Sequence, residues 1–381
     1  YRLRPVTEKK LEELGMTKLF YEIEMPLCRV LADMQEQGFM IDKAALVSFG
    51  EGLTGTIAEL ERAIYEHAGC EFNINSPKQL GEVLFDKLML KSTYADGLLK
   101  LIDPDGRIRT KFQMTVTATG RLSSTDPNLQ NIPIRKELGS HIREMFIASK
   151  GNVLVDADYS QIELRLLAHI SGDEHMRAAF LSGEDIHTVT ASQVFNTPID
   201  EVTPLQRSRA KAVNFGIVYG ISPWSLAQDI GVTQGEAKAY MDAYLNKYDG
   251  VRDYMKSIVE KAKQDGYVTT IYSRRRDLPE LKSSNFNTRS FGERVALNMP
   301  IQGTAADIIK LAMVNVYNRL KAEGLKARLI LQVHDELICE CPENEAQTVA
   351  DILREEMSGA ARLSVPLTVD AKIGHSWAEA H

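Results

Sequence analysis

The sequence predicts an α+β protein in which helices predominate and a few short strands form antiparallel sheets. Segments with strand character are few and far apart, and long segments with helical periodicity lie between them. Two strands at 327–334 and 337–341 are separated only by a tight turn at Asp335-Glu336, which is typical of an antiparallel hairpin. The composition, 44% hydrophobic and 25% charged in 381 residues, is that of a globular chain with two or three subdomains.

The first part of the chain predicts helices. Apolar residues recur at helical spacing along 18–37 and 44–68, which indicates that each segment buries one face. Ser76 and Pro77 are the residue types preferred at the N-cap and at the first position of a helix, so a further helix is expected to begin there.

Beyond residue 121 the pattern changes. The segment 152–158 is short and apolar and ends in an aspartate, so it is predicted as a buried strand, and 161–170 follows it as a helix. Periodicity and length predict the remaining elements, which are helices at 205–219, 234–248, 250–265, 293–322 and 343–357 and strands at 268–272 and 366–372.

The composition argues against several classes of protein. No apolar run is long enough to cross a membrane, and the opening residues lack the pattern of a signal peptide. The net charge of −7 argues only weakly against a nucleic-acid binder, because local basic clusters make phosphate contacts, and two occur at 207–211 and 274–276. The cysteines have no metal-binding spacing, so we expect reduced, structural thiols in a cytoplasm at Cys28, Cys70, Cys339 and Cys341.

Two aspartates lie at the ends of predicted strands. Asp158 ends one strand, and Asp335 lies at the hairpin turn before Glu336. A buried carboxylate is costly unless a cation neutralises it, and Mg²⁺ prefers carboxylate and phosphate oxygens. Two such sites facing each other would hold a pair of ions for phosphoryl chemistry. For either aspartate alone, capping a turn is the simpler interpretation. Asp156 lies on the same strand face as Asp158, and a hydrogen bond to a basic group is expected for it.

A stripe of cations and aromatic rings is predicted on the helix at 205–219. Arg207, Lys211, Phe215 and Tyr219 recur every fourth residue, so they share one face. Two cations followed by two aromatic rings suit a triphosphate at one end and a sugar and base at the other. The spacing alone is equally compatible with a solvated basic face beside two core aromatic residues.

Four segments resemble the motifs of family A DNA polymerases, the Klenow-like enzymes. DYSQIELR at 158–165 resembles the first catalytic motif, and VHDE at 333–336 resembles the third. RSRAKAVNFGIVYG at 207–220 resembles the nucleotide-binding fingers helix. TGRLSS at 119–124, followed by PNLQNIP at 127–133, resembles the segment that grips the duplex. The resemblance covers nearly the whole chain in the order of the family.

The resemblance implies a right-hand DNA polymerase that extends primer–template DNA with dNTPs, as a monomer in the bacterial cytoplasm at the nucleoid. It implies two Mg²⁺ ions, which Mn²⁺ can replace. The implied divisions are an N-terminal palm helix region at 1–42, a thumb at 43–102, palm at 103–162, fingers at 163–304 and palm again at 305–381.

The resemblance also implies roles for individual residues. The catalytic residues would be Asp158, Asp335 and Glu336, and the backbone carbonyl of Tyr159 would be a further metal ligand. Glu163 would exclude a 2′-hydroxyl. The remaining nucleotide contacts would be His187, Arg207 and Lys211 at the phosphates, Phe215 at the sugar and Tyr219 at the base. Contacts with DNA would be made by Ser76, Lys78, Arg121, Asn128, Gln130, Arg294, Asn298, Gln302 and His334.

The chain departs from the family at the thumb. The segments 72–80 and 92–94 match the two sides of the thumb, but a few dozen residues are absent between Leu90 and Lys91. We expect those two residues to lie too far apart for a peptide bond, because a segment has been left out. The proofreading and 5′-nuclease domains of the family have no counterpart here, so neither activity is expected.

Two rival functions remain. A single-subunit RNA polymerase would share this architecture, and Glu163 argues against it. A catalytically idle DNA-binding module would not need both Asp158 and Asp335. An rNTP-incorporation assay and a primer-extension assay distinguish the three functions.

Overall fold

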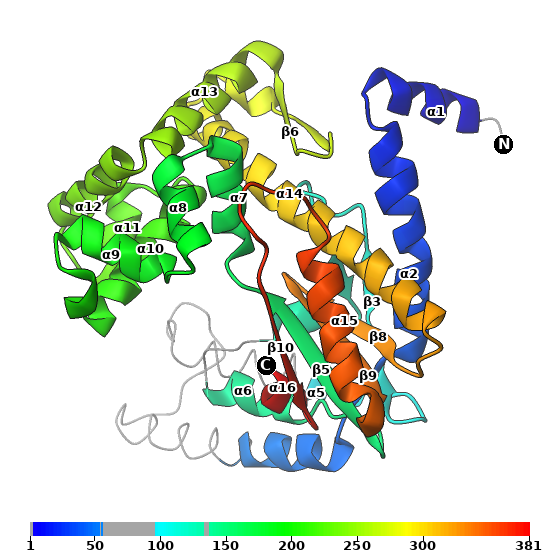
Figure 1. Ribbon diagram of the computed structural model, residues 1–381. Helices are drawn as coiled ribbons and strands as arrows, with labels where there is room; N and C mark the ends of the chain where they lie inside the picture. The colour runs from blue at the N-terminus through cyan, green and yellow to red at the C-terminus, as the bar shows by residue number, and fades with distance from the viewer. Residues whose placement is uncertain (1–2, 54, 56–95, 133–136) are drawn as a thin grey trace, which may run out of the picture.

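A four-stranded antiparallel sheet forms the centre of the computed structural model, which describes residues 3–53, 55, 96–132 and 137–381 (Figure 1). The strands are adjacent in the order β10 (Val369–Gly374), β5 (Asn152–Tyr159), β9 (Glu336–Pro342) and β8 (Arg328–Val333). Segments far apart in the sequence are therefore joined in one sheet. β5 lies between two neighbours and is buried along most of its length, which explains the apolar run at Val153–Val155.

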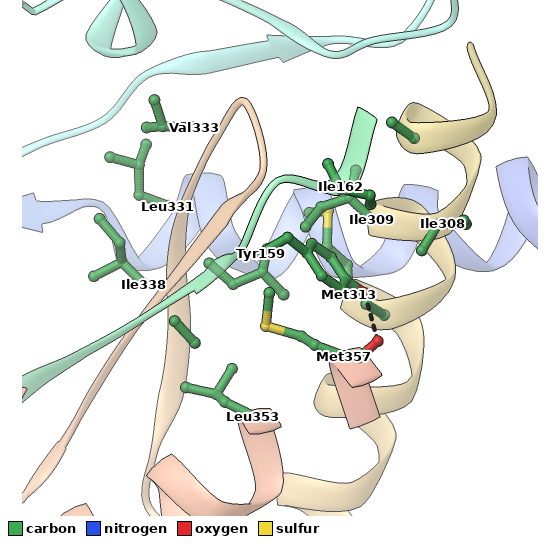
Figure 2. Close-up of a cluster of buried hydrophobic side chains, with 14 of the residues drawn as sticks. Tyr159, Ile162, Ile308, Ile309, Met313, Leu331, Val333, Ile338, Leu353 and Met357 are labelled. Carbon is green, nitrogen blue, oxygen red and sulfur yellow. Dashed lines mark hydrogen bonds between the residues drawn. The ribbon is translucent and has the colours of Figure 1, made fainter. Parts of the chain in front are cut away.

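The main core lies between this sheet and two helices, α14 (Phe286–Ala322) and α15 (Ala346–Ser358). Figure 2 shows Tyr159 of β5 lying beside Met313 of α14 and Met357 of α15. The phenol of Tyr159 donates a hydrogen bond of 2.6 Å to the carbonyl of Met357, so the polar end of this buried ring is satisfied. This packing holds the end of β5, where Asp158 lies, against the helices.

The N-terminal segment runs along the outside of this core. It contains α1 (Arg4–Glu13), a π-helical turn at Leu19–Glu24 and α2 (Met25–Gln37), which packs against α14 and β8. Gly38 ends α2 at φ +63°, and a Cβ there would lie 2.7 Å from the carbonyl oxygen of Ile108. Only glycine fits this turn.

Two small antiparallel strand pairs and a helix follow α2. β1 (Phe39–Met40) pairs with β2 (Arg107–Ile108), and β3 (Lys111–Gln113) pairs with β4 (Ser123–Thr125). Residues 43–53 are helical, as expected for the start of the segment 44–68. The rest of that segment, the helix start at Ser76, the DNA-contact candidate Lys78 and the Leu90–Lys91 junction lie outside the described residues.

A group of helices projects from the sheet and forms the left side of Figure 1. Its members, in chain order, are α7 (Ile162–Ser171), α8 (Glu174–Ser182), α9 (Ile186–Phe195), α10 (Pro204–Val218), α11 (Pro223–Ile230), α12 (Gln234–Lys247) and α13 (Asp249–Asp265). α10 begins sharply because Thr203 and Gln206 form a reciprocal capping box and Pro204 occupies the first position. α10 packs against α9, which brings the stripe beginning at Arg207 next to His187.

The long helix α14 connects the helical group to the sheet (Figure 1). A buried polar network fixes it to the N-terminal segment: Lys310 contacts Glu24 at 2.7 Å, and Arg274 pairs with both Glu24 and Asp307. Asp307 also accepts a hydrogen bond of 2.7 Å from Thr270. Two cations therefore balance two carboxylates in the interior.

Some sequence-based boundaries were wrong. The hairpin turn consists of His334 and Asp335, and Glu336 is already the first residue of β9, because His334 adopts a left-handed conformation at φ +51°. The strand expected at 268–272 is only Tyr267–Thr269 and pairs with β7 (Arg275–Asp277). The last strand begins at Val369 rather than Pro366.

The remaining described helices are α5 (Asp96–Leu99), α6 (Glu137–Glu144) and α16 (Trp377–Ala380). Short 3₁₀ turns at Leu129–Asn131, Ile199–Glu201, Pro279–Lys282 and Glu343–Glu345 complete the described elements. Within the described part of the chain, no helix has both the length and the apolar character needed to cross a membrane. Of the thiols described, Cys28 is exposed, Cys339 and Cys341 are buried, and all three are free.

Candidate active site

Carboxylates gather at one edge of the central sheet. In the strand register Asp158 lies opposite Glu336 of β9 and opposite Asp370 of β10. Asp335 lies in the turn before β9, and its carbonyl accepts a hydrogen bond of 3.2 Å from the Tyr159 amide. Asp158, Asp335 and Asp370 line one cavity of about 550 Å³. Acidic side chains placed directly opposite one another repel, so this edge needs a cation.

The two predicted catalytic aspartates are electrostatically strained. Burial, together with the charges of Asp335, Glu336 and Asp156, raises the pKa of Asp158 to about 8. The pKa of Asp335 is also raised, to about 6, mainly by burial and next by the negative charge of Glu163. Oδ1 of Asp158 is buried and has no hydrogen-bond partner among the described residues. Oxygen donors of this kind, without a basic partner in contact, suit a hard divalent cation.

A second acidic group behind this edge is neutralised by protein side chains. The imidazole of His381 lies 3.4 Å from Asp156 and 3.2 Å from Glu336, and the Arg143 guanidinium lies 3.8 Å from Glu336. These contacts raise the pKa of His381 to about 10, whereas burial raises the pKa of Asp156 to about 7. With His381 protonated, two cationic groups face two carboxyls, so the group needs no metal.

This arrangement places Glu336 away from the cavity. Its side chain is buried against Arg143 and His381, and it is absent from the cavity lining, although it was predicted as catalytic. Asp156 forms an ion-pair contact with a basic group, His381, but neither of its carboxylate oxygens makes the expected hydrogen bond with a described residue.

The predicted stripe of α10 lines the same cavity. Arg207, Lys211, Phe215 and Tyr219 all border it, opposite the aspartates. Arg207 donates to the carboxylate of Asp185 at 2.5 Å. Lys211 is exposed and makes no ion pair with any described residue, so its ammonium group is available to an anion. The stripe therefore borders a cavity while its cations remain exposed, and its role in nucleotide binding stays a prediction.

His187 joins this stripe from α9. Its ring lines the cavity, and its centroid lies 5.8 Å from that of Phe215. Burial lowers the pKa of His187 to about 4; Asp185 opposes this shift, and Lys211 and Arg207 add to it. The imidazole is therefore neutral at pH 7.

Glu163 links the base of the cavity to the end of the α10 stripe. Its carboxylate accepts 2.6 Å hydrogen bonds from Arg121 and from the phenol of Tyr219. Burial, followed by the charge of Glu163, raises the pKa of Tyr219 to about 12, so the phenol remains a donor. Because Glu163 is in the first turn of α7 and is nearly buried, its carboxylate is held in one place at the cavity wall.

The predicted DNA-contact residues lie in two places. Arg294, Asn298 and Gln302 recur every fourth residue of α14 and so share one face. Arg294 is exposed, and Asn298 has a buried Oδ1 without a hydrogen-bond partner. His334 and Arg121 border the cavity beside the aspartates.

Two further candidates lie behind the β8–β9 turn. Asn128 is exposed, and its side chain accepts hydrogen bonds from Ser124 and from the Gln130 amide. Gln130 is buried, and its side-chain amide donates to the carbonyl of Gln332 at 3.2 Å. Gln332 in turn donates to the His334 carbonyl at 2.7 Å. In this arrangement Gln130 supports the turn, and its direct contact with DNA stays a prediction.

Sequence reasoning missed several residues of the site. Asp370 lies in the last strand and borders the cavity, and Asp185 pairs with Arg207. An aspartate within a predicted strand was a usable signal for Asp370. The contacts of Asp185 with Arg207 and of Asn214 with His187 carried no signal in the sequence, because they form only when α9 packs against α10.

Comparison with known proteins places these features in one family. The sequence profile described as DNA polymerase family A matches residues 88–379. The chain is 48% identical to DNA polymerase I of Bacillus subtilis (strain 168), over 99% of this chain and 48% of the relative. It is also 48% identical to DNA polymerase I of Geobacillus stearothermophilus, over 95% of this chain and 46% of that protein. The chain thus spans about half the length of these curated relatives.

A solved structure is similar over nearly the whole chain. It is described as the POL domain of Pol1 from M. smegmatis in complex with DNA primer-template and dNTP. The TM-score is 0.94 and the sequence identity 42%, covering 98% of this chain and 73% of that chain. The alignment with the Bacillus subtilis protein extends over 419 residues, which exceeds the 381 of this chain, so the relative has positions inside the aligned region that this chain lacks.

Proposed function

The chain belongs to DNA polymerase family A, and we propose that it extends the 3′ end of a DNA primer on a template, using dNTPs and releasing pyrophosphate. One observation carries this proposal. A single cavity joins the aspartates at the sheet edge to the cationic and aromatic stripe of α10. The carboxylates suit the reacting end of a nucleotide, and the stripe suits its phosphates, sugar and base.

The order of the four stripe residues along α10 suggests which part of the nucleotide each would contact. Arg207 and Lys211 would bind the β- and γ-phosphates, with His187 donating a hydrogen bond beside them. Phe215 would pack on the sugar and Tyr219 near the base and the template, because they follow at one-turn intervals along the helix. Lys211 supplies the charge that has no other partner among the described residues. These contacts would hold the α-phosphorus near the carboxylates.

Family A polymerases use divalent metal ions, and the carboxylates of this chain fit them. Asp158 and Asp335 would hold two Mg²⁺ ions, with the Tyr159 carbonyl as a further ligand and Mn²⁺ as a substitute. When bound, the ions supply positive charge that favours the ionised primer hydroxyl and stabilises the leaving pyrophosphate. The chain itself contributes the ligand oxygens of Asp158, Asp335 and Tyr159. Glu336 stabilises this edge of the sheet by pairing with Arg143 and His381.

Sugar selection is assigned to Glu163. Arg121 and Tyr219 hold its carboxylate at the cavity wall, so it cannot easily move aside for a 2′-hydroxyl. A fixed side chain that excludes a larger substrate gives selectivity through a clash. This argues for deoxynucleotides over ribonucleotides as substrates.

The duplex would lie along the exposed side of the cavity. Arg294, Asn298 and Gln302 of α14, with His334 and Arg121, would contact the minor groove and the primer end. Minor-groove acceptors are similar on all base pairs, so donors there test the shape of a pair without reading its sequence. Asn128, Gln130, Ser76 and Lys78 are proposed as further DNA contacts. One chain provides the whole cavity, so we propose a monomer, acting at the bacterial nucleoid in the cytoplasm.

A primer-extension assay tests the function. The purified chain, a labelled primer on a defined template, Mg²⁺ and the four dNTPs should give template-encoded products. Matched reactions with rNTPs should give far less product. Binding of DNA without extension under any divalent ion would support the idle-module alternative, and equal use of rNTPs would support an RNA polymerase.

A further inference from the structure

Asn214 of α10 contacts the inner edge of His187. The side-chain nitrogen of Asn214 lies 3.0 Å from Nδ1 of the imidazole. Both side chains are buried, with 0% of Asn214 and 2% of His187 exposed, so water does not compete for this bond. Asn214 lies on α10 away from the cavity-facing stripe, and it contacts the cavity only through His187.

Two more buried residues fix the orientation of Asn214. The hydroxyl of Thr190 donates to Oδ1 of Asn214 at 3.2 Å, and it also lies 3.3 Å from the phenol of Tyr248. With its oxygen engaged by Thr190, the amide presents its NH₂ group to His187. An NH₂ group only donates, so Nδ1 of the neutral ring must accept, and the ring proton is then on Nε2.

Nε2 of His187 makes no hydrogen bond with any described residue, and the ring borders the cavity together with Arg207 and Lys211. An anionic phosphate oxygen can accept from an N–H, but it repels a lone pair. The charged groups facing the ring are Asp185, Arg207 and Lys211, and burial with the two cations keeps the ring neutral.

We propose that Asn214 is a positioning residue, which fixes His187 as the Nε2–H tautomer and thereby supplies a neutral hydrogen-bond donor for the triphosphate of the incoming nucleotide. This inference rests on the proposed function for its ligand. Thr190 and Tyr248 complete the chain of hydrogen bonds and tie α9, α10 and the end of α12 together. Without that chain both tautomers become accessible, and one of them presents a lone pair to phosphate.

The first test needs no substitution. Nitrogen-15 NMR distinguishes protonated from unprotonated ring nitrogens, so the full chain labelled at histidine reports the tautomer of His187 directly. We expect the Nε2–H form from pH 6 to pH 8. His169 is an internal control, because its Nδ1 accepts the Ser364 amide at 3.0 Å and must also be the Nε2–H form. An Nδ1–H or doubly protonated His187 at pH 7 would overturn the proposal.

The second test is Asn214→Asp, which keeps the shape and replaces the donating NH₂ by an accepting oxygen. His187 should then carry a proton on Nδ1, and the spectrum of His169 should not change. The KM for dATP in primer extension should rise by about tenfold or more at a pH where the ring is neutral, since a hydrogen bond to a charged acceptor is lost. Lowering the pH should restore affinity in this variant, because the imidazolium regains an Nε2–H, and wild type should show no such recovery.

Two further variants guard against a purely structural effect. Asn196→Asp adds the same charge at the exposed end of α9 and should leave both the tautomer and the KM unchanged. Thr190→Val frees the amide of Asn214 and should give a mixture of tautomers with an intermediate KM. An unchanged tautomer in Asn214→Asp and Thr190→Val would overturn the proposal. A chain that fails to polymerise but shows the expected tautomers would contradict only the proposed function.

Discussion

The aspartates at the sheet edge differ in kind from the other buried charges of this chain. Glu24 and Asp307 have cations in contact, and Asp156 and Glu336 face His381 and Arg143, as described above. Asp158 has carboxylates on both neighbouring strands and no basic group in contact among the described residues. These unneutralised carboxylates therefore favour binding of a cation from solution at this edge.

This property predicts how magnesium stabilises the fold at different pH. The folded pKa values of Asp158 and Asp335 lie near 8 and 6, above their ordinary 3.8. The folded chain binds these protons more tightly than the unfolded chain does. The contribution of the two groups to the free energy of unfolding therefore falls as pH rises from about 4 to 8. Mg²⁺ binds the ionised form, so it should raise Tm more at pH 8 than at pH 6.

Thermal unfolding with and without MgCl₂ at the two pH values checks this prediction. The Asp158→Asn/Asp335→Asn double variant serves as the control and should lose the pH dependence of the magnesium effect. An equal rise in Tm at both pH values in wild type would show that these carboxyls do not bind the ion.

Glu163 gives a second prediction at the scale of a residue. Glu163→Ala should increase rNTP incorporation relative to dNTP by at least several-fold, because it removes a clash with the 2′-hydroxyl. Glu163→Gln retains the volume and should retain most of the discrimination. The measurement is the ratio of kcat/KM for a matched dNTP and rNTP. An unchanged ratio in Glu163→Ala would place the sugar elsewhere.

The sequence indicated several residues that line the cavity, but it did not indicate the residues that hold cavity-lining side chains in place. Asp335 was expected in a turn after an apolar strand, and the period of four placed Lys211 and Tyr219 on one face. The partners Asp185 and His381 are far from these residues in sequence. These partners come close only when separate elements pack together, and local sequence patterns do not predict that packing.

Among the elements, long amphipathic helices were predicted well and short ones were missed. α9 is an example: its sequence IHTVTASQVF is rich in β-branched residues, which favour strands. The Asp185 cap, which accepts from the His187 amide at 2.9 Å, and packing against α10 override that preference. The predicted position of the turn in the β8–β9 hairpin was wrong by one residue. His334 adopts a left-handed conformation, and a histidine in the sequence does not by itself predict one.

The attachment of α14 to the N-terminal segment yields a third prediction. Lys310 is fully buried with Glu24, so Lys310→Met should lower the unfolding free energy by about 3–5 kcal/mol, because it leaves a buried carboxylate with less compensation. Lys321→Met is the matched control, since Lys321 pairs with Asp33 at the surface and should cost no more than about 1 kcal/mol. Urea unfolding measures both. Equal losses would show that the buried pair contributes nothing beyond a surface pair.

At the scale of the molecule, the fold class was predictable, because the motifs resemble one family along nearly the whole chain. The α+β class is confirmed by the antiparallel sheet and the similar polymerase domain. The division into palm, thumb and fingers stays a prediction. The pairing of β5 and β10 with the predicted β8–β9 hairpin could not be derived from local periodicity, since each of these strands is compatible with many partners.

The expectation that the chain lacks part of a thumb at the Leu90–Lys91 junction gives a fourth prediction. Inserting a family-length segment between Leu90 and Lys91 should tighten DNA binding and steepen its salt dependence, by about 0.9 in log–log slope for each phosphate contact regained. A glycine–serine insert of equal length is the control and should change neither quantity. Fluorescence anisotropy with a labelled primer–template, measured over a range of salt concentrations, gives both. An unchanged slope with the family segment would mean that this part of the thumb makes no phosphate contact.

The central claim is that the carboxylates at the sheet edge perform catalysis, while the rest of the chain binds the substrates. Single-nucleotide incorporation by Asp158→Ala and Asp335→Ala, beside DNA binding by the same proteins, tests it most directly. Asp253→Ala, an exposed position on α13, is the control. We expect each catalytic variant to lose about a hundredfold or more in rate, since bound ions contribute several kcal/mol at the transition state, with little change in DNA affinity. Incorporation within about tenfold of wild type in either variant would contradict the account.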